Sequence, residues 1–164
     1  MTISYIEKGI GLHHAIEAAG HRLRQVDGVW ISTDDAAVQA IIDGYSLATA
    51  KATKKAEVRA IAREKYDLAV AGISPGELAG WPVLLEGAAA YAADGTITTA
   101  ISIEAQTRGI PVADLVAKIE SNAAQYQAVR AAIAGTDGKL RDEIDALTTF
   151  EAVAAYDVTG GWPL

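Results

Sequence analysis

Residues 22–43 read RLRQVDGVWISTDDAAVQAIID, and this stretch decides the fold of the N-terminal part of the chain. Its centre is Asp27-Gly28, which separates two short runs of extended character. An Asp-Gly pair in this position is the strongest short signal for a two-residue hairpin, because both central residues of a type I′ turn need positive φ. We therefore predict two antiparallel strands, at about residues 21–26 and 29–32.

The second half of this stretch predicts a helix. The hydroxyl of Ser32 or Thr33 can accept a hydrogen bond from a backbone N–H of the first turn and so cap the helix. Asp34 and Asp35 then lie in the first turn, where negative charge interacts favourably with the helix dipole. Gly44 is expected to end the helix.

A strand and a helix are also expected before the hairpin. Polar and apolar residues alternate over residues 2–7, which is the pattern of a short strand with one buried face. Leu12, Ile16 and Ala19 then follow at helical spacing. Together with the hairpin and the helix after it, these elements predict a small α+β module with a β-hairpin and two helices at residues 1–45.

From residue 46 onward the sequence is rich in alanine and predicts helices. The first of them covers about residues 47–71. Ser74 is a cap residue followed by Pro75 at the first helical position, which predicts the start of the next helix. Pro82 lacks a backbone donor and clashes with the preceding turn, so we expect a kink or a restart there.

Three more helices are expected toward the C-terminus. Residues 96–107 fit both helical spacing and strand alternation, and we favour a helix. Residues 112–133 have the most regular apolar face, and the glycines of residues 135–138 should end that helix. A further amphipathic helix follows around Ile144. The fold class is thus α+β, in which the N-terminal module precedes a mainly α-helical antiparallel domain at residues 46–164, either compact or extended.

The composition argues against several classes of function. The chain has 164 residues, a net charge of −7 and no cysteine. A negative chain opposes non-specific binding to nucleic acid, which depends on clustered Lys and Arg. No apolar run reaches the roughly 18 residues of a membrane span, so we expect no membrane insertion, and synthesis in the cytoplasm. Much of the hydrophobic content is alanine, which buries little area, and this indicates an oligomer or a larger assembly.

No residue pattern indicates catalysis, a metal or a cofactor. The nucleophile elbow, the phosphate-binding loop and the dinucleotide fingerprint do not occur in the sequence. His13 and Glu17 are four residues apart and could supply two metal ligands, but a metal site needs at least a third. We therefore interpret them as ordinary helix residues, and we expect neither a metal, nor a cofactor, nor enzymatic activity.

Two features are candidates for partner binding. Lys55, Arg59 and Arg63, named the basic ridge, repeat every four residues along one helix face. They could dock an acidic partner, or form a solvated face paired with nearby Glu and Asp. The other feature is a pair of large aromatic side chains, Trp30 and Trp162. Because Trp162 follows two glycines, it either packs back onto the helices or anchors a neighbouring subunit.

The chain resembles a known group of proteins over most of its length. The segment VDGVWISTDDAAVQAIIDGY at residues 26–45 is similar to small proteins of tailed bacteriophages, and to their prophage counterparts, that are associated with tail tips and tail fibres. The helical ends of such proteins are similar to later parts of this chain, namely AREKY at residues 62–66, the long helix to residue 135, IDAL at residues 144–147 and the closing Trp162.

This resemblance implies a non-enzymatic role in a phage tail. One such role is a structural component of the virion that docks at the baseplate or the tail-fibre attachment region, in several copies of a symmetric assembly. The other is a tail-fibre assembly chaperone, which binds the fibre while it trimerises and then leaves. Both roles imply phage tail or fibre proteins as partners and synthesis in the host cytoplasm. The resemblance carries no catalytic residues.

Overall fold

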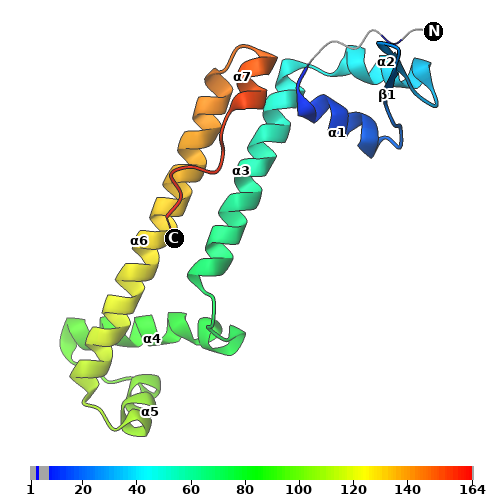
Figure 1. Cartoon of the computed structure of the whole chain (residues 1–164). Coiled ribbons are helices and arrows are strands. Elements are labelled where there is room, and N and C mark those ends of the chain that lie inside the picture. The colour runs from blue at the N-terminus through cyan, green and yellow to red at the C-terminus, as the bar shows by residue number, and fades with distance from the viewer. Residues whose placement is uncertain (1–2, 4–7, 164) are drawn as a thin grey trace. The chain divides into compact units, whose positions relative to one another are not determined.

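The computed structural model of the chain describes residue 3 and residues 8–163. Within these residues the chain is mainly helical, with seven helices and one small two-stranded sheet (Figure 1). This agrees in outline with the predicted α+β class, although helix dominates. The elements in chain order are α1 (Ile10–Ala18), β1 (Arg24–Val26), β2 (Val29–Ile31), α2 (Asp35–Gly44), α3 (Leu47–Ala69), α4 (Pro75–Asp94), α5 (Thr99–Arg108), α6 (Val112–Ala146) and α7 (Phe150–Ala155).

Contacts divide the chain into two compact units. Unit 1 contains the described residues up to Arg63 together with Gly135–Trp162, and unit 2 is built on Glu64–Ala134. Helices α3 and α6 each contribute residues to both units. The units are therefore discontinuous in sequence, whereas the composition placed a boundary at residue 45, and that boundary stays a prediction.

The predicted hairpin is present in unit 1. Strands β1 and β2 pair in an antiparallel register that sets Val26 opposite Val29. Asp27 and Gly28 have φ values of 49° and 79°, so both turn residues adopt the left-handed conformation that an Asp-Gly pair supplies at low cost. Ile3 forms an isolated antiparallel bridge to Trp30. The remaining residues of the strand predicted at residues 2–7 lie outside the described part of the chain.

The cap of α2 differs from the prediction. Asp34, and not Ser32 or Thr33, is the N-cap residue, and its Oδ1 accepts a hydrogen bond of 2.9 Å from the N–H of Ala37. Ser32 instead accepts a hydrogen bond of 3.0 Å from the N–H of Asp34, which turns the chain just before the helix. A carboxylate accepts more strongly than a hydroxyl, and its charge also suits the positive end of the helix dipole. The predicted start was therefore early by one or two residues.

Unit 1 has two clusters of buried side chains. In the first, helices α1 and α2 pack together through Leu12, Ile16, Val38 and Ile42, whose exposed fractions are all 0%. The Nζ of Lys8 donates hydrogen bonds to the carbonyls of residues 42 and 45, at 2.6 and 2.8 Å, and so satisfies carbonyls at the C-terminal end of α2. The second cluster joins α3, α6 and the C-terminal segment, and it contains Val58, Leu140, Ile144 and Val158.

Helix α4 in unit 2 begins as predicted and continues through Pro82. Ser74 caps it by accepting a hydrogen bond of 3.1 Å from the N–H of Glu77. The helix passes through Pro82 without a break, so of the two predicted alternatives the restart is wrong, while a kink at Pro82 stays a prediction. Pro82 removes the donor of one helical hydrogen bond, and the other hydrogen bonds of α4 keep the helix continuous. Gly95 ends the helix in the left-handed conformation.

The prediction of a helix end at residues 135–138 is also wrong, because α6 runs unbroken from Val112 to Ala146. A glycine inside a helix costs only about 1 kcal/mol relative to alanine. Within this part of the helix an ion pair of 2.8 Å joins Arg141 to Asp137 across one turn, which supports the helical backbone where the glycines weaken it.

The core of unit 2 lies between α4, α5 and α6. The prediction of a helix for residues 96–107 is confirmed by α5, which Thr98 caps. Ile101 has an exposed fraction of 0% and packs with Ala88, Ala105, Leu115 and Val116. Among all the described residues, none of the helices combines the length and apolar character that crossing a membrane requires.

Candidate functional site

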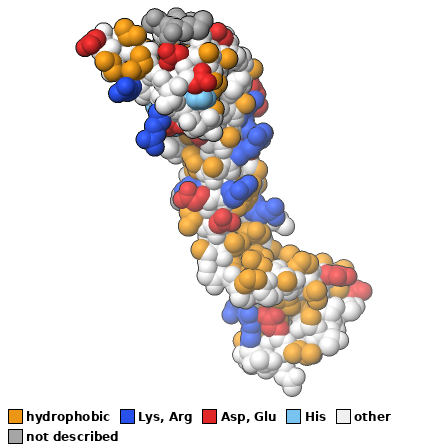
Figure 2. All heavy atoms as spheres, turned by 90° about the vertical axis from the view of Figure 1, so that its right-hand side faces the viewer, with side chains coloured by type: hydrophobic (Ala, Val, Ile, Leu, Met, Phe, Trp, Pro, Cys, Tyr) orange, Lys and Arg blue, Asp and Glu red, His pale blue; other side chains and the backbone are white. Residues whose placement is uncertain are grey.

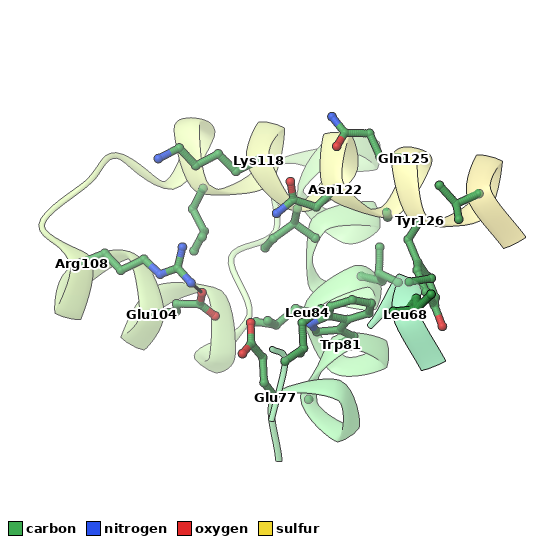
Figure 3. A pocket seen from close by; sticks show the side chains of 18 residues that line it. Leu68, Glu77, Trp81, Leu84, Glu104, Arg108, Lys118, Asn122, Gln125 and Tyr126 are labelled. Atoms are coloured by element: carbon green, nitrogen blue, oxygen red, sulfur yellow. Dashed lines mark ion pairs between the residues drawn. The ribbon is translucent and has the colours of Figure 1, made fainter. Parts of the chain in front are cut away.

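An apolar groove of about 650 Å³ lies within unit 2 (Figure 3). Its walls come from α4, α5, α6 and the last residues of α3, and we refer to it as the unit 2 groove. The apolar side chains that line it are Leu68, Ala69, Ile73, Trp81, Leu84, Leu85, Leu115, Ile119, Ala123, Tyr126 and Val129. The α6 members of this set repeat at three- and four-residue steps, so they occupy one face of that helix.

An aromatic pair forms one part of the groove. The rings of Trp81 on α4 and Tyr126 on α6 meet edge to face, with centroids 5.2 Å apart and an interplanar angle of 80°. The guanidinium of Arg130 lies 5.5 Å from the centre of the Tyr126 ring. Edge-to-face pairs and cation–π contacts each contribute roughly 0.5–1.5 kcal/mol, so this part of the wall is held in place before any ligand binds.

Charged and amide side chains form the rim. On α5, Arg108 and Glu104 form an ion pair of 2.7 Å. Glu77 on α4 and Lys118 on α6 are exposed, and neither has an ion-pair partner within the part of the chain that the structure describes. Asn122 and Gln125 continue the polar rim along α6 from Lys118 (Figure 3).

Several apolar side chains of unit 2, one of them in the groove, are open to solvent. Leu68, Val83, Ile97 and Ile103 have exposed fractions of 49%, 56%, 52% and 59%. Hydrophobic side chains gather on the face of unit 2 that Figure 2 shows, with charged groups between them. Contiguous apolar surface of this kind is typical of protein interaction sites. The groove can therefore bind an apolar surface while its rim interacts with polar groups around it.

The basic ridge lies on α3 in unit 1, but its three members differ. The Nζ of Lys55 is 2.7 Å from a carboxylate oxygen of Asp145, and the hydrogen bond from Lys55 lowers the pKa of that carboxyl. Arg59 and Arg63 are exposed and have no ion-pair partner among the described residues. The solvated, paired alternative therefore describes Lys55, while the two arginines remain open to a partner.

The two tryptophans predicted as partner residues both contact their own unit. Trp30 on β2 is half-buried and packs against the first cluster of unit 1. Trp162 packs against the second cluster, and its Nε1 donates a hydrogen bond of 2.8 Å to the carbonyl of Val158. Of the two alternatives for Trp162, the chain adopts the one in which the ring packs back. Whether either ring also contacts a partner stays a prediction.

The histidine and glutamate of α1 form a simple pair. His13 Nε2 lies 3.5 Å from Glu17 Oε1, and both side chains are partly exposed. Among the described residues, no group of three or more His, Cys, Asp and Glu side chains is placed to hold a metal ion. This pair is consistent with ordinary helix surface residues that interact across one turn.

Tyr156 offers a test of unit 1 at high pH. Burial, and then the hydrogen bond that Tyr156 donates to Glu143, raises the pKa of Tyr156 from 10.0 to about 12. The pKa of Tyr156 is higher in the folded protein than in the unfolded chain. The stabilisation of unit 1 by the neutral Tyr156 side chain is therefore complete below pH 10 and disappears as the pH rises toward 12. In a tyrosinate absorbance titration, the Tyr156→Phe variant should lack the highest-pH step of the wild type. Loss of a step near pH 10, with the highest-pH step of the wild type retained, would contradict the raised pKa of Tyr156.

The sequence did not reveal the groove, although it contained some of its parts. Trp81 directly precedes Pro82, and Tyr126 lies within residues 112–133, for which the sequence predicts a helix with a regular apolar face. Nothing in the sequence related these residues, because their contact depends on how α4 packs against α6. Comparison of the chain with protein-family models, with curated proteins and with solved structures found no match.

Proposed function

We propose that this protein is a non-enzymatic structural component of a phage tail that docks at the baseplate or the tail-fibre attachment region. The observation that supports docking is the unit 2 groove, which has a volume of about 650 Å³ and an aromatic pair in its wall. The resemblance of residues 26–45 to tail-associated proteins supports the phage part. In this proposal the partners of the protein are phage tail or fibre proteins, and several copies of the protein take part in a symmetric assembly.

The composition of the groove supports protein binding. Tryptophan, tyrosine and arginine dominate the energetics of protein interfaces, because large rings bury much area and lose little conformational freedom. Trp81 contacts Tyr126 in the wall of the groove, and Arg130 contacts the Tyr126 ring. In the same proposal, the hairpin module of residues 1–45 and an antiparallel arrangement of the later helices act as scaffold.

Mass spectrometry of purified phage particles tests this function. A structural component should be present in a fixed ratio to the major tail proteins, as expected for a symmetric assembly. If the chain is absent from particles, and its deletion leaves the fibre misfolded, it is a tail-fibre assembly chaperone and the structural proposal is wrong. Recovery of a stoichiometric nucleotide or metal with the pure protein would contradict both roles.

Reversal of charge at the two unpaired arginines of the basic ridge tests whether α3 takes part in docking. The Arg59→Glu/Arg63→Glu variant should reduce incorporation into particles severalfold, because an acidic surface that meets them would then be repelled. Helical content should not change, since both side chains are exposed. The Arg22→Glu/Arg24→Glu variant is the control for net charge. Equal incorporation of both variants would show that the basic ridge is solvated surface and takes no part in docking.

A further inference from the structure

We propose that the unit 2 groove binds a basic amphipathic α-helix of a partner protein, with its apolar face on Trp81 and Tyr126 and a basic side chain beside Glu77. This inference rests on the docking function proposed above and specifies the partner. It is carried by three features of the groove, namely the source of its walls, its length along α6, and the charges of its rim and of unit 2.

The walls of the groove favour a helical occupant. Apart from Ile73, all lining residues belong to helices, whose backbone N–H and C=O groups bond within each helix. An extended peptide would therefore find few backbone partners, and its own N–H and C=O groups would be buried without hydrogen bonds at a cost of about 1–3 kcal/mol each. A helix satisfies these groups internally and presents only side chains.

The length of the groove defines the length of that helix. Its α6 wall extends from Leu115 to Val129, which corresponds to about 21 Å at 1.5 Å per residue. An occupant helix lying along this wall would therefore contact it over about 14 residues, or four turns. Apolar side chains at i, i+3, i+4, i+7 and i+11 would face the groove over that distance.

The net charge of unit 2 indicates the charge of the partner helix. Residues Glu64–Ala134 contain eight Asp and Glu against four Lys and Arg, a net charge of −4. On the rim, the Arg108 charge is already matched by Glu104, whereas neither Glu77 nor Lys118 has an ion-pair partner among the described residues, so the rim itself is balanced in charge. The overall negative charge of unit 2 therefore favours a basic helix, which sets a basic side chain beside Glu77 and any acidic side chain near Lys118. A second copy of unit 2 would instead bring like charges together.

Two glycines of α4 provide a blocking variant and its control. A Cβ built on Gly80 or on Gly76 meets no heavy atom within 4 Å, so either position accepts a larger side chain. Gly80 lines the groove and Gly76 does not. Gly80→Leu therefore fills the groove, while Gly76→Leu makes the same chemical change one turn earlier on the same helix.

The probes are two designed peptides of about 15 residues with the same leucine spacing, one with lysine and one with glutamate at its polar positions. Binding to the full chain is measured by fluorescence polarisation of the labelled peptide. The contact is located by ¹⁹F NMR of 5-fluorotryptophan-labelled protein, in which Trp81 reports on the groove and the other two tryptophans lie in unit 1.

We expect the lysine peptide to bind at least about tenfold more tightly than the glutamate peptide, and to shift the Trp81 resonance alone. Gly80→Leu should weaken binding at least about tenfold, and Gly76→Leu by less than about twofold. Glu77→Gln should weaken binding of the lysine peptide and leave binding of the glutamate peptide unchanged. Because Glu77 is exposed, this mild change tests the role of charge even if the Gly80→Leu variant does not fold.

Three results would overturn the inference. The first is equal binding of the two peptides or tighter binding of the acidic one, and the second is binding unaffected by both Gly80→Leu and Glu77→Gln. The third is a dimer of the wild-type chain that Gly80→Leu converts to a monomer, since the occupant would then be a second copy. A chain present in particles that fails these tests keeps its structural function and loses only this inference.

Discussion

Replacing Gly87 with alanine should lower the free energy of unfolding of unit 2 by about 1–3 kcal/mol, although alanine normally stabilises a helix. A Cβ at residue 87 would lie 2.6 Å from Thr98 Oγ1 and 2.7 Å from Ile101 Cγ1. Thr98 caps α5 and Ile101 is fully buried, so neither side chain can move without loss. The close approach of α4 and α5 therefore requires glycine at this position.

Gly76→Ala is the matched control in the same helix. It meets no neighbouring atom, and it should raise stability by up to about 1 kcal/mol through its helix propensity. The two variants are compared by chemical denaturation, and hydrogen exchange locates the change, which should appear in α4 and α5 for Gly87→Ala. Equal stabilisation by both alanines would show that α4 and α5 do not approach closely at Gly87.

The features that could be predicted from the sequence depend on neighbouring residues. The Asp27-Gly28 turn and the Ser74 cap follow from side chains within three or four positions of each other, and both are present. The N-cap of α2 was predicted one or two residues too early. Several adjacent side chains could cap the helix, and only the conformation of the surrounding backbone selects Asp34. Local chemistry thus predicts the existence of an element better than its first residue.

A restart at Pro82 and a helix end at residues 135–138 were predicted from single residue types, and neither occurs, for a shared reason. Pro82 and the glycines of residues 135–138 weaken a helix by an amount that other interactions can exceed. In α6 those interactions include the Arg141–Asp137 ion pair and the burial of Leu140 and Ile144 on either side of Arg141. A propensity argument omits these terms, because they depend on the packed structure.

The candidate site shows the same division between local and distant information. The sequence placed Leu115, Ile119, Tyr126 and Val129 on one face of a helix, and this face now forms a wall of the groove. It did not reveal that this face stays partly uncovered, since that depends on the positions of α4 and α5. The Lys55–Asp145 pair is similar, because it joins residues 90 positions apart.

Replacing Trp162 with alanine should lower the free energy of unfolding of unit 1 by about 2 kcal/mol. The estimate follows from roughly 3–5 kcal/mol for a fully buried tryptophan, reduced because this ring is half-buried. The ring packs on a cluster that includes Val58, Ile144 and Val158, so its loss exposes apolar surface of α3 and α6.

Trp162→Phe separates packing from hydrogen bonding in this prediction. Phenylalanine keeps most of the apolar contact but lacks the Nε1–H that donates to the carbonyl of Val158, and this loss should cost about 1 kcal/mol. Hydrogen exchange should increase in residues 47–63 and 135–146 for the alanine variant, with unit 2 unchanged. Deletion of residues 160–164 should have at least the effect of Trp162→Ala, because it removes the same ring. Unchanged denaturation midpoints for all three variants would mean that the terminal ring does not stabilise unit 1, and its value to the protein would then have to lie in a contact with another chain.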